Sequence, residues 1–387
     1  MKRSLWTYLA GALVLALSAC ESELPTNSLS LQLELPDTPY TYQVGFAGDS
    51  TNLVINNHKA TLGRVLFYDR QLSANNSLSC ASCHKQSIAF TDNARFSKGF
   101  GGKLTTRNSM PIQDLGPSFF VGFGVNSQPK PKTLNVTDSF FPGFGPKVLF
   151  WDGRENVLNK MVLRPVVNHV EMGVGDLNLL AEKLAAVPYY PTLFNKAFGS
   201  SEVTSEKIAD AIAAFVSSIN TTQTKFDHWA RQEAVLSAEE QRGFQLFFEK
   251  YDCNSCHQIT SPNGYISAGT FANIGLDEQY ADQGVARVSG NEADAGKFKI
   301  PSLRNVALTA PYMHDGRFST LEEVIDHYSE GMQDNPNLDP RLRTAQGDPK
   351  VMNISASEKQ AIIAFLHTLT DRQMISDVRF SDPFRVK

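Results

Sequence analysis

Apolar residues recur with helical spacing in four segments of the chain, two in each half. Residues 63–69 and 243–249 each begin with glycine and continue with large apolar side chains, a pattern that predicts a short helix. Residues 208–219 and 361–366 are rich in Ala, Ile and Phe. One helical stripe of the first of these carries Ile208, Ala211, Phe215 and Ile219. The pattern therefore predicts an amphipathic helix that closes each half.

A helix-capping signal marks the start of the second half. Ser237 is followed three residues later by Glu240, which is the spacing of a capping box. Residues 222–233 lie between the first closing helix and this box. We therefore place a domain boundary within residues 222–233 and expect an all-α architecture with long loops.

The first twenty residues have the pattern of a targeting segment. Positive residues precede the apolar stretch 5–17, which is shorter than the about 20 residues of a membrane span. The stretch leads to Leu-Ser-Ala-Cys, ending at Cys20, which resembles the bacterial lipoprotein processing box. An ordinary signal peptide with a stray cysteine is the alternative. The lipoprotein interpretation makes residues 1–20 a signal peptide, Cys20 an acylated residue and residues 21–45 a tether, and it places the protein in the periplasm or cell envelope.

Composition narrows the class of protein further. The 387 residues are 42% hydrophobic and 20% charged, as in a globular protein with a substantial core. The net charge of -4 gives no sign of the basic face that nucleic acid requires. After the N-terminus, no stretch is long and apolar enough to span a bilayer. We therefore expect no nucleic-acid partner, and contact with a membrane only through the N-terminal lipid.

The remaining four cysteines form two Cys-x-x-Cys pairs, and each pair is followed directly by histidine. Residues 80–84 read Cys-Ala-Ser-Cys-His and residues 253–257 read Cys-Asn-Ser-Cys-His. This is the attachment motif of c-type haem, in which two thiols bind the vinyl groups of the porphyrin and the histidine binds the iron. The motifs predict two covalent haem c groups, held by residues listed together here: Cys80, Cys83, His84, Cys253, Cys256 and His257.

Two alternatives for the cysteines fit less well. A four-cysteine zinc site usually separates its pairs by about 15–20 residues, whereas 173 positions separate Cys80 from Cys253. A redox-active disulfide does not require a histidine after both pairs. With one haem motif in each half, we expect two tandem cytochrome c-like domains, at residues 46–225 and 226–387.

A third repeated segment supports this division. Phe-Trp-Asp-Gly-Arg at residues 150–154 matches Met-His-Asp-Gly-Arg at residues 313–317. Arg107-Asn108 and Arg304-Asn305 also match if the first half contains an insertion within residues 110–145. This insertion is rich in Gly, Pro and Phe, and we expect an ordered loop near the first haem or the domain interface.

Together these motifs resemble those of the bacterial di-haem cytochrome c peroxidase family, which includes the MauG-like enzymes that modify tryptophan. The resemblance rests on both haem motifs, residues 150–154, Pro165 with Glu171-Met172, and Thr-Ala-Pro-Tyr-Met-His-Asp-Gly at residues 309–316. It covers nearly all of the chain after the targeting segment. It implies a first haem that reacts with hydrogen peroxide and a second haem that transfers electrons.

The internal repeat suggests how the two haems differ. The position equivalent to Tyr328 in the first half is Pro165, whose side chain has no donor atom. The resemblance makes Tyr328 the distal ligand of the second haem, a position held by Met in ordinary peroxidases and Tyr in MauG-like enzymes. It places Pro165 beside the open face of the first haem. Met313 and Met332 are rival distal donors, the latter if its segment is helical.

The first haem is expected to keep an open iron position. Many family members close it with histidine in a Gly-His-Gly step, but residues 99–102 read Gly-Phe-Gly-Gly. His169 is the nearest rival ligand, and a structural role suits it better. Glu171 is the candidate acid–base catalyst for peroxide cleavage; a surface glutamate on a polar turn is the alternative. Met161 stands where relatives usually carry Gln, so the pocket lacks that amide.

Two further roles are implied by the resemblance. Trp151 occupies the position between the haems where an indole can relay electrons, although it can equally be a large core aromatic. The family binds one calcium ion between its domains, through oxygen ligands. The matching positions are the Asn108 side chain and the backbone carbonyls of Thr309 and Pro311, with Asn135 as a rival for Asn108.

Three functions remain open at this point. The leading one is a cytochrome c peroxidase that reduces hydrogen peroxide to water with electrons from a small cytochrome or copper protein. The second is a MauG-like oxidase that modifies Trp or Tyr of a partner protein, which Tyr328 supports. The third is a di-haem electron carrier without catalysis, which would require neither an open iron nor Glu171 in the pocket.

Overall fold

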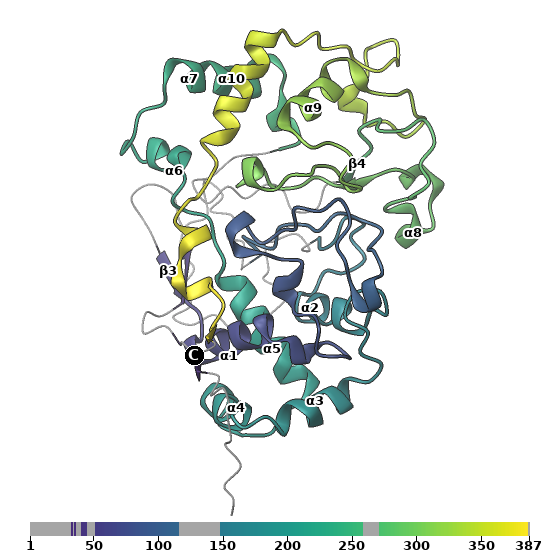
Figure 1. Cartoon of the computed structure of the whole chain (residues 1–387). Helices are drawn as coiled ribbons and strands as arrows, with labels where there is room; N and C mark the ends of the chain where they lie inside the picture. Colours follow the sequence, from purple (N-terminus) through teal and green to yellow (C-terminus); the bar gives the residue numbers. More distant parts are fainter. Residues whose placement is uncertain are drawn as a thin grey trace, which may run out of the picture.

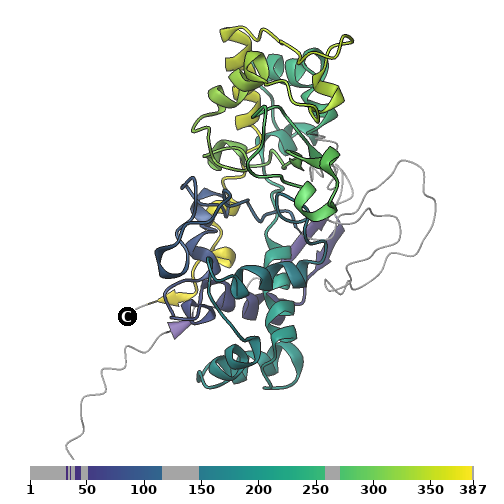
Figure 2. The same cartoon turned by 90° about the vertical axis from the view of Figure 1, so that its right-hand side faces the viewer.

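The computed structural model describes residues 32–33, 35, 40–44, 51–115, 148–257 and 271–385. Figure 1 shows two helical halves, with α1 to α5 in the lower half and α6 to α10 in the upper one, and the view in Figure 2 separates them again. No helix in these ranges has the length and apolarity required to cross a bilayer. The expected signal segment with Cys20, Asn135 and most of the insertion 110–145 lie outside the described residues.

Ten α-helices and three two-stranded sheets make up the regular structure of the described ranges. The α-helices are α1 (Asn57–Tyr68), α2 (Leu158–Val167), α3 (Leu177–Ala185), α4 (Tyr190–Phe198), α5 (Ser205–Ser218), α6 (Lys225–Ala230), α7 (Ala238–Gln245), α8 (Ala286–Ser289), α9 (Leu321–Asp326) and α10 (Ala356–His367). The antiparallel strand pairs are β1 (Gln32–Leu33) with β6 (Phe384–Arg385), β2 (Thr41–Val44) with β3 (Thr51–Val54), and β4 (Phe271–Ala272) with β5 (Phe298–Lys299). The protein is thus rich in helix with little sheet, as the sequence predicts.

Short helical turns connect these elements. Two are π-helical, η5 (Leu246–Lys250) and η9 (His327–Gly331). The remaining turns are of the 3-10 type: η1 (Arg70–Leu72), η2 (Cys80–Ser82), η3 (Gln86–Ile88), η4 (Phe100–Gly102), η6 (Cys253–Ser255), η7 (Glu292–Asp294), η8 (Val306–Leu308), η10 (Pro340–Leu342), η11 (Met374–Ser376) and η12 (Val378–Phe380). Both haem motifs begin in such a turn.

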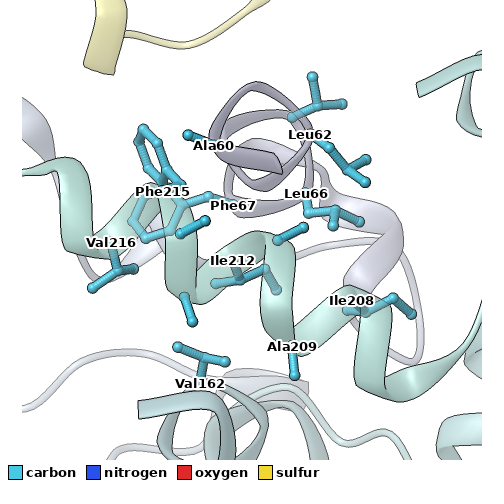
Figure 3. Packing of buried hydrophobic residues seen from close by; sticks show 14 of the residues in the cluster. Ala60, Leu62, Leu66, Phe67, Val162, Ile208, Ala209, Ile212, Phe215 and Val216 are labelled. Carbon is cyan, nitrogen blue, oxygen red and sulfur yellow. The ribbon is translucent and has the colours of Figure 1, made fainter. Parts of the chain in front are cut away.

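The predicted helices form, and the two halves repeat the same helix crossing. Helix α1 packs against α5, and α7 packs against α10. A Cβ atom on Gly63 would lie 1.9 Å from the carbonyl oxygen of Ala211, and one on Gly243 would lie 1.9 Å from that of Ala361. Only glycine allows backbones to approach this closely. Figure 3 shows the apolar side chains that fill the first crossing, including Phe67.

The Asp-Gly-Arg repeat is also a repeated turn. Phe150 and Met313, which open the two segments, both have positive φ angles, of 63° and 73°. An antiparallel bridge closes each turn, between Leu149 and Glu155 in one half and between Tyr312 and Phe318 in the other. The same local geometry in both halves confirms the internal repeat that the sequence indicates.

The end of the chain returns to the first half. From α10 in the upper half, the last segment runs down to the C-terminus beside α1 (Figure 1). Met374 and Phe380 belong to the core of the first half. The Tyr40 hydroxyl donates a hydrogen bond to the Arg379 carbonyl (3.0 Å), and the Tyr68 hydroxyl donates one to the Phe380 carbonyl (2.6 Å). The sequence assigns all of residues 226–387 to the second domain, whereas this segment packs with the first, because the first core would otherwise be exposed there.

The expected boundary region contains a buried ion pair. Arg304 and Asp227, at the start of α6, form a pair at 2.6 Å with side chains that are 2% and 0% exposed. Arg304 also donates to the carbonyl of Thr221 (2.7 Å). Removing one partner of such a pair would leave an uncompensated buried charge. The chain between the halves is therefore held in one conformation.

We expect Gly63→Ala and Gly243→Ala each to lower the free energy of unfolding of the holoprotein by about 1–3 kcal/mol or more, because the new methyl group overlaps a helix carbonyl. Denaturant titration followed by circular dichroism measures this. Gly175→Ala is the matched control, since a Cβ there meets nothing within 4 Å; it should change stability by no more than about 0.5 kcal/mol. Equal effects for all three variants would contradict the crossing argument.

Candidate haem sites

The two Cys-x-x-Cys-His motifs fold into the same turn. In each, the histidine N–H donates to the carbonyl of the first cysteine, at 3.0 Å for His84 and Cys80 and at 2.8 Å for His257 and Cys253. All four cysteines in the described ranges are free thiols. The turn therefore brings two thiols and one imidazole together in each half, as attachment of a c-type haem requires.

Both histidines have the hydrogen bonding and the protonation state that an iron ligand requires. The Nδ1 atom of His84 lies 2.9 Å from the Phe90 carbonyl oxygen, and Nδ1 of His257 lies 3.1 Å from that of Pro301. Burial lowers the pKa of both side chains, to about 4 for His257, so the imidazoles are neutral. Nδ1–H then donates to the carbonyl and Nε2 is left free. A metal-bound histidine in proteins almost always has this arrangement.

A zinc site built from both cysteine pairs does not form. Within the described part of the chain, the residues of the two motifs form no joint cluster that could hold a metal ion. The two motifs instead lie in separate halves of the molecule (Figure 1). Each motif must therefore act on its own.

A cavity of about 220 Å³ lies against the second haem motif. Cys253, Cys256 and His257 line it, and most of the other lining side chains are apolar, among them Phe247, Ile325 and Leu366. An apolar lining suits a porphyrin, whose faces are hydrophobic. The thiols, the free Nε2 atom and the apolar walls together match the requirements of a covalently bound haem.

Tyr328 projects into this cavity, whereas Met332 does not. Tyr328 belongs to η9, and its side chain lines the cavity together with Met313. Burial raises the pKa of its phenol above the usual value, and the thiols of Cys256 and Cys253 raise it further. Met332 is not among the lining residues and packs behind the cavity wall in a small cluster with Leu338 and Leu342. Of the three donors that the sequence leaves open, Tyr328 and Met313 thus remain.

The predicted acid–base residue lies beside the first haem motif. The carboxylate of Glu171 accepts a hydrogen bond from the Asn168 amide (2.8 Å). Burial raises its pKa, which the positive charge of Arg154 partly opposes. The Glu171 charge contributes to the raised pKa of Cys80 and of Cys83, so its carboxylate is within electrostatic range of both thiols. The structure thus brings Glu171 into the first haem region.

A contact that sequence reasoning missed holds the Glu171 turn in place. The Phe100 N–H donates to the carbonyls of Val170 and Glu171, both at 2.8 Å. A Cβ on Gly173 would lie 2.8 Å from the Phe100 ring, so the ring rests on that glycine. The segment expected to lack the distal histidine therefore supports the Glu171 turn. The Gly-Phe-Gly-Gly composition was the only available sign of it.

The other predicted residues of this region take different positions. Met161 is buried in α2, one turn before Pro165. The carbonyl of Pro165 accepts the N–H of Met172 at 3.2 Å and so ties the helix to the Glu171 turn. His169 is exposed, and its preferred structural role stays a prediction.

Trp151 connects the halves. It belongs to the Phe-Trp-Asp-Gly-Arg segment of the first half, yet its side chain lines the cavity in the second half. Its indole Nε1–H donates to the Asn108 carbonyl (2.9 Å), and its own carbonyl accepts the N–H of Lys299 (2.7 Å). Trp151 is therefore a packing residue. It is also the aromatic residue that connects the cavity in the second half with the first half.

The three predicted calcium ligands share this location. Asn108, Thr309 and Pro311 all line the second cavity. The Asn108 amide nitrogen donates to the Ala94 carbonyl (3.1 Å), which turns its oxygen away from that carbonyl. The calcium site stays a prediction, with its three candidate residues in the wall of one cavity.

An ion-pair network between the halves gave no signal in the sequence. Arg107 binds Asp152 of the first half (2.6 Å) and Asp282 of the second (2.6 Å). Arg95 and Asp315 form a second pair across the same boundary at 3.3 Å. These contacts join residues far apart in the sequence, so local patterns could not reveal them.

Comparisons with known proteins agree with this site. A family model for di-haem cytochrome c peroxidase matches residues 57–235. The methylamine utilization protein MauG of Methylorubrum extorquens is 31% identical over 325 residues, 80% of this chain and 78% of the relative. Cytochrome c551 peroxidase of Nitrosomonas europaea is 32% identical over 320 residues, 81% and 80%. Among solved structures, a MauG-like protein associated with microbial copper homeostasis superposes with a TM-score of 0.68 at 34% identity, covering 84% of this chain and 93% of that one.

We expect Tyr328→Phe to remove the distal ligand of the second haem and to change its low-spin spectrum, because the phenol oxygen lines the cavity and is the candidate donor that the repeat predicts. Met332→Leu is the control and should leave that spectrum unchanged. Electron paramagnetic resonance and absorbance of the ferric protein measure both. Loss of the low-spin signal in Met332→Leu, with Tyr328→Phe unaffected, would show that the tyrosine assignment is wrong.

Proposed function

Because this chain belongs to the di-haem cytochrome c peroxidase family, which implies two c-type haems, we propose that it is an oxidoreductase that reduces hydrogen peroxide at the first haem. Cys80, Cys83 and His84 hold that haem, and the second motif holds its partner. The bound haem supplies iron that can be oxidised and reduced. The chain's own residues orient the haem, exclude ligands and move protons.

Glu171 is the proton-transfer residue of this proposal. Cleavage of peroxide requires a proton to move from the oxygen nearer the iron to the one that leaves as water. The Glu171 carboxylate is within electrostatic range of the first haem thiols and is oriented by Asn168. Its raised pKa brings it nearer to neutrality, where a group can both accept and donate a proton. A pure electron carrier would have no use for this group.

Reduction of peroxide consumes two electrons and two protons and releases two water molecules. The electrons can come from a small cytochrome or copper protein, which makes the enzyme a peroxidase. They can also come from a Trp or Tyr side chain of a partner protein, which is thereby oxidised in a MauG-like reaction. The two functions share the first haem and differ in the electron source, so the second haem decides between them.

The position of Tyr328 favours oxidation of a partner protein. Burial disfavours a free phenolate, so the anion forms only if a cation such as ferric iron compensates for it. A phenolate ligand in turn stabilises oxidised over reduced iron, whereas a thioether raises the potential. The second haem is then hard to reduce and poorly suited to accept electrons from a cytochrome. Tyr328 therefore supports the MauG-like function over the cytochrome c peroxidase function.

The peroxidase function remains as a second candidate. Met313 also lines the second cavity, so a thioether is within the same space. Ligation by Met313 would give the second haem a higher potential and would suit acceptance of electrons from a small redox protein. A relative of similar identity is named cytochrome c551 peroxidase.

Two further features complete the proposal. One Ca²⁺ ion binds at the boundary of the halves, through the Asn108 side chain and the carbonyls of Thr309 and Pro311, whose oxygen donors suit calcium. Cys20 is lipidated, and the lipid anchors the protein in the periplasm or cell envelope, where c-type haem proteins of this kind meet exported partners.

We expect Glu171→Gln to slow peroxide consumption by about 10²–10⁴-fold, because an amide cannot accept the proton. In the unmodified protein the rate should fall as the pH is lowered through the pKa of Glu171, which burial places above the usual value; the variant should lose this dependence. Stopped-flow absorbance between pH 4 and 9, a range on the order of the carboxyl and histidine pKa values, measures both. Glu182→Gln, on the exposed side of α3, is the control. An unchanged rate in Glu171→Gln would remove Glu171 from the mechanism.

We expect Tyr328→Met to increase the peroxide-dependent oxidation of reduced cytochrome c by at least about tenfold, because a thioether raises the potential of the second haem. The unmodified protein should instead change the mass of small exported proteins encoded by adjacent genes when peroxide is added, by loss of hydrogen or by addition of oxygen. Steady-state absorbance and mass spectrometry measure the two reactions. If the unmodified protein oxidises cytochrome c at least as fast as Tyr328→Met and modifies no protein, the peroxidase function holds.

A further inference from the structure

Lys299 is the one lysine or arginine among the residues that line the second cavity. It lies in β5, and its neighbours in the lining are Phe298, Ile300 and Pro301. A cationic side chain is costly to bury without an anion. Its presence in a largely apolar haem cavity therefore calls for a partner.

No residue in the described ranges supplies that partner. The Lys299 ammonium group makes no ion pair or hydrogen bond there, whereas nearby Lys297 pairs with Asp294 at 3.0 Å. Burial alone lowers the pKa of Lys299, to about 8, with no contribution from a charged neighbour. Asp252 also lines the cavity but does not affect this pKa. The protein thus holds an uncompensated cation in the wall of the cavity.

The backbone fixes where this cation lies. The Lys299 N–H donates to the carbonyl of Trp151 (2.7 Å). The preceding residue, Phe298, stacks on His314, with ring centroids 3.7 Å apart and planes 13° apart. Lys299 therefore extends from a rigid strand at the boundary of the halves, directly beside Trp151.

We propose that Lys299 binds a propionate carboxylate of the second haem and so positions the propionate edge of that haem next to Trp151. A haem carries two propionates, and their charge must be compensated when the group is buried. The cysteines hold the vinyl groups, which leaves the propionates free to reach other parts of the cavity wall. Lys299 is a positioning residue, and it sets the orientation of the haem relative to the residue that leads to the first half.

The pairing has a measurable electrostatic consequence. Addition of an electron to the haem makes the site more negative, and a nearby cation stabilises that state. Lys299 thus partly offsets the effect of the Tyr328 phenolate and keeps the second haem reducible. This inference depends on the second haem but not on whether the electrons come from a cytochrome or a protein side chain.

Lys299→Met tests the proposal in the full-length holoprotein. We expect the one-electron reduction equilibrium of the second haem to shift at least tenfold toward the ferric form, a potential lower by about 59 mV. Lys299→Arg should retain the potential of the unmodified protein, since it retains the charge. Spectroelectrochemical titration measures the potential, and pyridine haemochrome absorbance checks that two haems per chain are present.

Lys297→Met is the matched control, because that lysine already pairs with Asp294 and is not among the cavity-lining residues. An unchanged potential in Lys299→Met, or an equal shift in Lys299→Arg, would overturn the proposal. If Lys299→Met does not incorporate the second haem, Lys299→Arg decides: incorporation at the original potential supports the need for a cation, and its failure refutes it. A haem content of zero in the unmodified protein would refute the proposed function itself, which separates the two failures.

Discussion

Close contact between a helix backbone and a glycine sets the geometry of each half. At Gly63 and at Gly243, the helix before the haem loop rests directly on a carbonyl of the closing helix. Phe215 and Phe365 lie at the same place in the two crossings, each with its Cβ 2.8 Å from the position of a glycine Cβ. Because interiors are close-packed, this crossing leaves little freedom in where the first helix ends. The end of this helix therefore determines the position of the haem loop that follows, and so the positions of its cysteines and histidine.

The two halves differ most where they meet. Trp151 and Asn108 come from the first half but line the cavity of the second. The Arg107 ion pairs with Asp152 and Asp282 hold this junction from the outside, and the buried Arg304–Asp227 pair holds it from within. A rigid junction matters for electron transfer, because the distance between two redox groups is then fixed by the fold.

The sequence predicts those features that depend on local patterns. Helical periodicity, the capping box at Ser237 and the two Cys-x-x-Cys-His motifs are each contained in a few consecutive residues, and the structure has them as expected. The internal repeat also predicts that Tyr328 and Pro165 are equivalent positions. Counting from one Asp-Gly-Arg turn to the other needs no knowledge of the tertiary fold. Lys299 and the support of Glu171 by Phe100 could not be predicted in this way. Both depend on segments that meet only after folding, and neither has a distinctive neighbourhood in the sequence.

Because the last segment returns to the first half, it must be present before the first half can fold completely. The Gln86 side chain, two residues after His84, donates to the carbonyls of Met374 (3.1 Å) and Asp377 (2.8 Å), and Arg64 binds Ser381. These partners follow the first haem motif only after most of the second half. The first half consequently cannot close until residues 374–381 have been made and have folded back onto it. A gene fragment that stops at the domain boundary would encode a first half with an open core and an unsupported haem loop.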